Sequence, residues 1–87
     1  MRFALNKEQW DKLLYNSEKI SDFPATVGNF LQYYTEKKSH GNFNMAFDAK
    51  RKVFGVWYDN YLDKFEGEEL IDAMFDLFCH LEGIQWK

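Results

Sequence analysis

Apolar residues in the first part of the chain recur at the three- and four-residue spacing of a helix. The first such stripe consists of Trp10, Leu13 and Leu14. Asn6 precedes the stripe, and Gln9 follows Asn6 at the position where a capping-box partner reaches back to the cap. This pattern predicts a helix that begins after Asn6 and fades over residues 16–19.

A second amphipathic helix follows. Its apolar stripe consists of Val27, Phe30, Leu31 and Tyr34. We expect it to begin at Ser21 or Asp22, with Pro24 in the first turn, where the missing N–H of proline has no cost. Gly41 then supplies a helix stop or a turn.

The apolar period changes to two after residue 42. Phe43, Met45 and Phe47 alternate with polar or small residues and predict a half-buried strand over 42–48. Residues 53–58 are β-branched and aromatic, with apolar groups on both faces, so they predict a second strand that is central or covered on both sides. Together they predict an antiparallel hairpin with a basic tip. Residues 59–65 fit either a short third strand or an irregular turn.

The last element is a helix with a broad apolar stripe. The stripe consists of Leu70, Ile71, Met74, Phe75, Leu77, Phe78 and Leu81. Gly83 stands where a helix-terminating glycine belongs, and Ile84 and Trp86 are expected to fold back onto the body. The order is therefore α-α-β-β-α. It predicts one α+β domain over residues 1–87, with helices packed on a short antiparallel hairpin or three-stranded sheet.

Composition adds an aromatic-rich core and a cellular context. The 87 residues include nine Phe, five Tyr and three Trp, and each such ring removes a large area from water when it is buried. Cys79 is the single cysteine, which excludes an internal disulfide and suits a reducing compartment. No apolar run is long enough for a secretory signal or a membrane span. We therefore expect a soluble, cytoplasmic protein with no membrane association.

Charge is unevenly distributed. The net charge is −3, yet residues 59–87 hold two Lys against eight acids. The predicted partner-binding residues are seven of these acids and the neighbouring tyrosines: Asp59, Asp63, Glu66, Glu68, Glu69, Asp72, Asp76, Tyr58 and Tyr61. On the last helix Glu69, Asp72 and Asp76 share a face opposite the core, and no Lys or Arg lies between residues 67 and 83. Such a face is either a solvated surface or a docking surface for a basic partner, which it would steer electrostatically or engage by mimicking a nucleic acid.

A basic surface offers an alternative. Its residues are Lys37, Lys38, Lys50, Arg51 and Lys52, at the hairpin tip and just before the hairpin. Basic residues beside aromatic strands can bind single-stranded nucleic acid. The negative net charge and the absence of the aromatic pattern of an RNA-recognition motif make this the weaker interpretation.

No catalytic or metal-binding signature accompanies these surfaces. Cys79 and His80 are adjacent on a helix, so their side chains diverge by about 100° and do not form a nucleophile–base pair. Asp59 and Asp63 open a segment that lacks the ligand order of a calcium loop. One cysteine and two distant histidines do not make a structural zinc site. We therefore expect no enzyme activity, no metal and no cofactor.

The sequence carries the motif of no family that we recognise. A small, acidic-faced, aromatic-rich domain resembles, as a class, the inhibitors that phages and mobile elements encode, such as antirestriction and anti-CRISPR proteins. The leading hypothesis is therefore a non-enzymatic protein-binding module that occludes a host protein, with nucleic-acid-handling proteins among the targets. The alternatives are a nucleic-acid-binding module that uses the hairpin tip, and a self-assembling subunit or homo-oligomer that uses spare aromatic surface.

Overall fold

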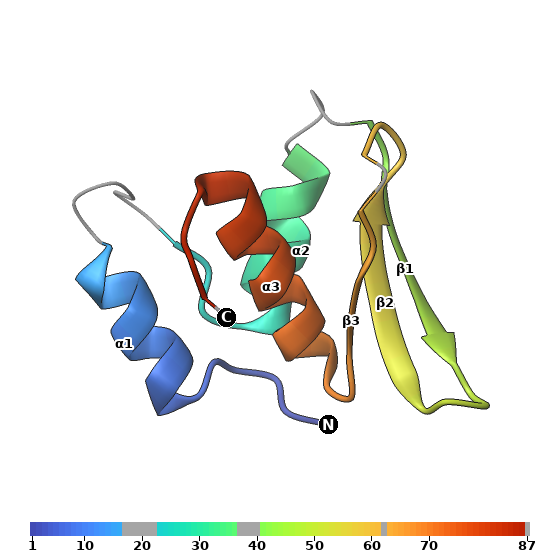
Figure 1. Ribbon diagram of the computed structural model, residues 1–87, viewed down its shortest axis with the longest axis horizontal. Coiled ribbons are helices and arrows are strands. Elements are labelled where there is room, and N and C mark those ends of the chain that lie inside the picture. The colour runs from blue at the N-terminus through green and yellow to red at the C-terminus, as the bar shows by residue number, and fades with distance from the viewer. Residues whose placement is uncertain (17–22, 37–40, 62, 87) are drawn as a thin grey trace.

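Three helices and a three-stranded antiparallel sheet make up the part of the chain that the computed structural model describes, residues 1–16, 23–36, 41–61 and 63–86 (Figure 1). The elements in chain order are α1 (Lys7–Tyr15), α2 (Val27–Glu36), β1 (Phe43–Asp48), β2 (Val53–Tyr58), β3 (Phe65–Gly67) and α3 (Leu70–Glu82). The α+β class is confirmed, with β3 added to the predicted order.

The sheet has the order β1-β2-β3, so β2 is the central strand, as its two apolar faces predicted. In the β1–β2 pair Phe43 lies opposite Tyr58 and Asp48 opposite Val53, without a bulge. In the β2–β3 pair Phe65 lies opposite Val56. The sequence left the structure of segment 59–65 open, and among its described residues only Phe65 belongs to a strand.

The core lies between α3 and the helix-facing side of the sheet. Buried side chains occur along α3 from Leu70 to Cys79, and α3 packs against β2, β3 and α2. The Tyr34 hydroxyl on α2 donates a hydrogen bond to the Met74 carbonyl of α3. The Tyr58 hydroxyl on β2 donates to the Tyr34 carbonyl at 3.0 Å. These two buried bonds join three elements around the aromatic cluster.

The predicted start of α2 is wrong by several residues. The helix begins at Val27, after Thr26, whose Oγ1 accepts from the Asn29 N–H at 3.1 Å and so caps the helix. The residues just before it are extended and pair with the N-terminal segment, because the Leu5 N–H donates to the Ala25 carbonyl at 2.9 Å. Pro24 therefore precedes the helix. The predicted starting residues, Ser21 and Asp22, lie outside the described residues.

The apolar face predicted for α1 is only partly correct. Leu13 is fully buried, whereas Trp10 and Leu14 are 36% and 55% exposed. Gln9 is buried in their place at 2% exposure, because α1 meets α3 through a polar contact. The capping box itself is confirmed: the Asn6 side chain accepts from the Gln9 N–H, and the Gln9 side chain accepts from the Asn6 N–H.

Strand β1 is also less buried than its alternation predicted. Phe43 packs on Tyr34 and Tyr58, but Met45 and Phe47 are 49% and 53% exposed. The reason is that β1 is an edge strand, while α3 packs over β2 and β3. Figure 1 shows β1 at the side of the molecule farthest from α1.

The end of α3 follows the prediction. Gly83 adopts the left-handed conformation, with a φ of 70°, and its N–H bonds back to the last turn. Ile84 is buried, and the Trp86 ring packs edge-on against Phe75 with centroids 4.9 Å apart. Among the described residues, none of the helices has the length and apolar character needed to cross a membrane.

Candidate functional site

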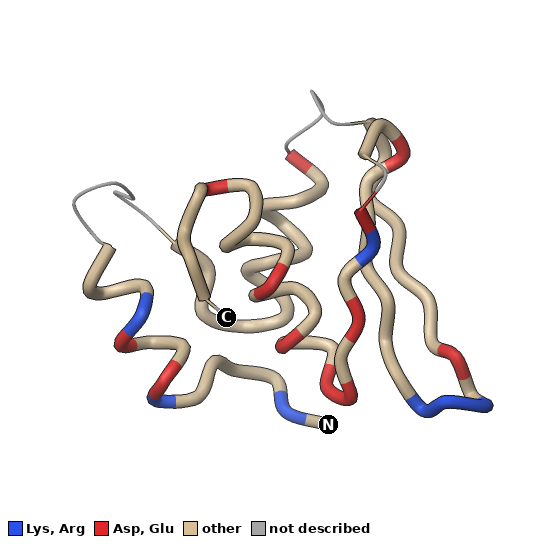
Figure 2. Tube along the Cα trace, viewed as in Figure 1, with Lys and Arg blue, Asp and Glu red and all other residues tan. Residues whose placement is uncertain are grey.

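An acidic surface follows β3, the residues that flank it and the first half of α3, with Glu66 on the face of the sheet turned away from α3 because it pairs with Gly55. We call this surface the acidic strip, and it consists of Asp63, Glu66, Glu68, Glu69, Asp72 and Asp76. These residues lie just before, within and after β3 and along the first half of α3, which packs against β3 (Figure 2). Tertiary structure thus brings together the acids of two segments. The remaining predicted acid, Asp59, lies instead at the end of β2, where it accepts a hydrogen bond from the Asn44 side chain at 2.6 Å.

Two arginines from distant parts of the chain reach the acidic strip. The Arg2 N–H donates to the Glu69 carboxylate at 2.9 Å, and its guanidinium bonds Asp72 at 2.9 Å. The Arg51 guanidinium pairs with Glu66. The expectation of an unneutralised helix face is therefore wrong for Asp72, because its partner lies 70 residues away in sequence.

A polar network behind the acidic strip fastens α1 to α3. The buried Gln9 side chain donates from Nε2 to Asp72 at 2.7 Å and accepts from the Arg2 guanidinium at 3.0 Å. Its oxygen also accepts the Asn6 N–H at 3.0 Å. Asp72 thus has a structural role within the domain in addition to its place on the strip.

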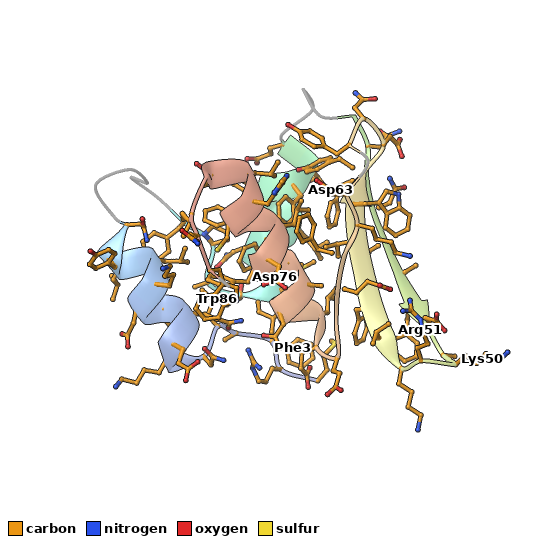
Figure 3. All side chains as sticks on the ribbon, viewed as in Figure 1. Phe3, Lys50, Arg51, Asp63, Asp76 and Trp86 are labelled. Atoms are coloured by element: carbon orange, nitrogen blue, oxygen red, sulfur yellow. The ribbon has the colours of Figure 1, made fainter. Side chains whose placement is uncertain are left out.

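Phe3 is an exposed aromatic residue that the sequence interpretation did not single out. Its side chain is 64% exposed, although its backbone is fixed: the Phe3 carbonyl accepts from the Val27 N–H at 2.8 Å. The preceding Arg2 is held by Glu69 and Asp72. Figure 3 shows Phe3 beside the N-terminal end of α3, below Asp76. No sequence pattern marks this position, because Phe3 lies in an extended segment outside any periodic pattern.

The two tyrosines predicted to bind a partner do not flank the acidic strip as exposed groups. Tyr58 is fully buried, and burial raises the pKa of its hydroxyl. Tyr58 is therefore corrected to a core residue. Tyr61 is half-buried and packs near Tyr58, with ring centroids 6.5 Å apart.

One cation of the basic hairpin tip, Arg51, already pairs with acidic residues of the same domain. Asp48 accepts from the backbone N–H groups of Lys50 and Arg51 and from the Arg51 guanidinium at 2.9 Å. The Arg51 hydrogen bond, followed by the backbone ones, lowers the pKa of Asp48. Lys50 and Lys52 remain as exposed cations at the tip. Lys37 and Lys38 lie outside the described residues.

A shallow, open hollow of about 310 Å³ lies beside the end of α3. Its lining includes Asp76, Cys79, His80 and Trp86. Burial, with a smaller contribution from Asp76, raises the pKa of the Cys79 thiol to about 12, so the thiol is protonated at neutral pH. His80 lies at the surface, 3.5 Å from Asp63. The arrangement supplies no activated sulfur nucleophile.

The described residues contain no group of three or more His, Cys, Asp or Glu side chains that could hold a metal ion. Comparison of the chain with protein families, with curated proteins and with solved structures finds no match. The surface features that could bind a partner are therefore the acidic strip, Phe3 and the other exposed apolar side chains.

Proposed function

We propose that this chain is a non-enzymatic protein-binding module that recognises a partner with a basic surface. The acidic strip supplies the complementary charge, and Phe3 supplies an apolar anchor at its end. The observation that carries the proposal is a large aromatic side chain held in solvent by a fixed backbone next to a row of carboxylates.

The fixed backbone matters because binding then orders few additional groups. Arg2 is bonded to α3 and the Phe3 carbonyl to the first residue of α2, so the backbone from which the ring projects is held in place before a partner arrives. Preorganisation of this kind reduces the entropy lost on association. Aromatic rings are enriched at the centres of protein interfaces, where they fill pockets of the partner.

The charge of the acidic strip favours a basic partner. The six carboxylates of the strip outnumber Arg2, Arg51, His80 and Lys64, the basic residues that pair with them or adjoin them in sequence, so the formal charge of this surface is negative. A surface of one sign accelerates encounter with a surface of the opposite sign and suppresses like-charged partners. Phosphate-binding grooves are basic surfaces, so inhibition of a nucleic-acid-handling protein is one form that this function would take.

Two single substitutions with matched controls test the proposal. Phe3→Ala removes the anchor and Glu68→Lys reverses an exposed charge of the strip. Tyr15→Ala and Asp11→Lys make the same kinds of change at exposed positions on α1. Each tagged variant is used to capture proteins from lysate of the source cells, once with and once without nuclease treatment. We expect the unsubstituted chain and both controls to capture one protein in an amount stoichiometric with the tagged chain. We expect Phe3→Ala and Glu68→Lys to lose that protein.

Retention of that protein by both Phe3→Ala and Glu68→Lys would overturn the proposal. Recovery of nucleic acid alone, or of proteins that disappear after nuclease treatment, would favour the basic tip instead. The structure makes that alternative the weaker one, since Arg51 is already bonded to Asp48 and Glu66. Lys50→Ala together with Lys52→Ala would then be the deciding variant, because lost phosphate contacts weaken binding and reduce its salt dependence.

A further inference from the structure

The outer edge of β1 carries a regular row of backbone groups that the described chain leaves unpaired. Strand order places β1 at the edge, and its six residues pair with β2 in unbroken register. Natural edge strands are usually protected by a bulge, a proline or a charged residue within the strand. Between Phe43 and Phe47 the strand has none of these.

The register shows which groups point outward. The Asp59 N–H donates to the Asn42 carbonyl at 3.1 Å, and these two residues face each other one step beyond the Phe43–Tyr58 pair. Hydrogen-bonded and non-hydrogen-bonded pairs alternate along an antiparallel ladder. The even-numbered residues of β1 therefore bond to β2. Phe43, Met45 and Phe47 direct their N–H and C=O groups away from the sheet.

The side chains of this edge are self-complementary. Read in either direction from Met45, β1 places a Phe two residues away, Phe43 on one side and Phe47 on the other. Met45 and Phe47 are about half exposed, on the same face as Phe43. A second copy paired antiparallel about Met45 would set Met45 against Met45 and Phe43 against Phe47 of the partner copy. Cross-strand aromatic pairs of this kind stabilise a sheet.

The charges at the two ends of the edge also favour an antiparallel second copy. Lys50 projects from the hairpin tip, beyond the Asp48 end of the strand (Figure 3). Asp59 lies at the other end, and its β-carbon is 3.3 Å from where a β-carbon of Gly41 would stand. Antiparallel pairing about Met45 puts Asp48 opposite Asn42 of the partner copy, so Lys50 lies at the same end of the interface as the partner's Asp59. Parallel pairing would bring the like-charged ends together instead.

We propose that β1 is the interface between two copies of this chain, which pair antiparallel about Met45 into one continuous six-stranded sheet. Two backbone hydrogen bonds form at each Phe43–Phe47 pair and at the Met45 pair. The apolar area is small, so the dimer is concentration-dependent and belongs to the weak end of specific interfaces. This surface is separate from the acidic strip, so the proposal does not depend on the proposed partner.

Sedimentation equilibrium measures the first consequence. The chain mass is 10.5 kDa, and we expect the average mass to rise towards twice that value as protein concentration approaches about 1 mM. A mass that stays at one chain throughout this range would overturn the proposal. Phe47→Lys is expected to raise the dissociation constant about tenfold or more. Leu14→Lys is the matched control, since Leu14 is equally exposed on α1, and it is expected to leave the constant unchanged.

A charge exchange tests the pairing direction. Asp59→Lys brings Lys50 against a lysine at both ends of the dimer and is expected to weaken association about tenfold. The double variant Asp59→Lys with Lys50→Asp restores opposite charges, and its dissociation constant is expected to return to within about threefold of the original. Circular dichroism of each variant checks that the monomer is folded. Failure of the second substitution to restore association would overturn the antiparallel arrangement.

Amide hydrogen exchange identifies the surface itself. In the dilute monomer we expect Phe43, Met45 and Phe47 to exchange fast, while the amides between them are protected by β2. In concentrated protein the three outward amides are expected to become protected as well. A dimer that leaves them unprotected uses another face, and protection that arises only when a different protein is added means a different occupant. Either result would overturn the proposal.

Discussion

Gln9→Ala is the substitution whose effect on stability depends most directly on the tertiary structure. The Gln9 side chain is 2% exposed and makes three hydrogen bonds: to the Asn6 N–H, to the Arg2 guanidinium and to the Asp72 carboxylate. These bonds complete the cap of α1 and fasten α1 to α3. Alanine removes all three and does not lower helix propensity.

The expected loss of stability follows from the three groups to which the Gln9 side chain is bonded. A neutral hydrogen bond contributes about 0.5–1.5 kcal/mol and one to a charged group about 1.5–3 kcal/mol. The side chains of Arg2 and Asp72 are 39% and 36% exposed and remain paired with each other, so water replaces part of what Gln9 provided. Halving the two charged contributions gives a loss of about 3 kcal/mol in the free energy of unfolding. For a domain of this size that loss lowers the Tm by roughly 12–24 °C.

Urea denaturation followed by circular dichroism measures the change in the free energy of unfolding. Gln32→Ala is the matched control, because Gln32 lies on the exposed side of α2 and its side chain bonds the exposed Glu36 at 3.3 Å. We expect the control to stay within about 0.5 kcal/mol of the original chain. The explanation given for Gln9 would be refuted if Gln9→Ala and Gln32→Ala differed by less than about 1 kcal/mol.

Three further predictions concern the core and the end of α3. Tyr34→Phe removes the hydroxyl that bonds the Met74 carbonyl and is expected to cost about 1 kcal/mol in urea denaturation; an unchanged midpoint would contradict that role. Gly83→Ala has open space around it but a φ of 70°, so a backbone cost of about 1 kcal/mol is expected, and a stabilised variant would disprove it. The pKa of Cys79 is about 12, against 9.0 for a free thiol, so its thiolate fraction at pH 8 is roughly 1,000-fold smaller. We therefore expect iodoacetamide to modify this thiol only in unfolded protein. Rapid modification of folded protein would show that the thiol is not buried.

Local sequence patterns were sufficient to predict those features that depend on residues only a few positions apart. The Asn6–Gln9 capping box, the apolar stripe of α3 and the glycine stop at Gly83 each join neighbouring residues, and all three are confirmed. The hairpin follows from the switch to a period of two. The start of α2 was misplaced because Thr26 caps the helix only after residues 23–26 have paired with the N-terminal segment.

For the candidate site, too, some residues could be predicted from local sequence and others depended on the tertiary structure. Its acids were visible in the sequence because they are concentrated after residue 59. Arg2 as the partner of Asp72 and Phe3 as a fixed exposed ring were not visible, since both depend on where the N-terminal segment docks. Tyr58 was misassigned because alternation along a strand states which residues share a face, without stating which face the helices cover.

The sequence by itself determined the type, order and approximate bounds of most helices and strands, and the acidic character of the last third of the chain. Hydrophobic periodicity, caps and turn residues encode these features through contacts between near neighbours. Only the tertiary structure decided that β1 is an open edge, that α1 is fastened through Gln9 and that Arg2 reaches α3. These features join residues tens of positions apart. Whether such contacts form depends on how whole elements pack to bury apolar area, which no local pattern records.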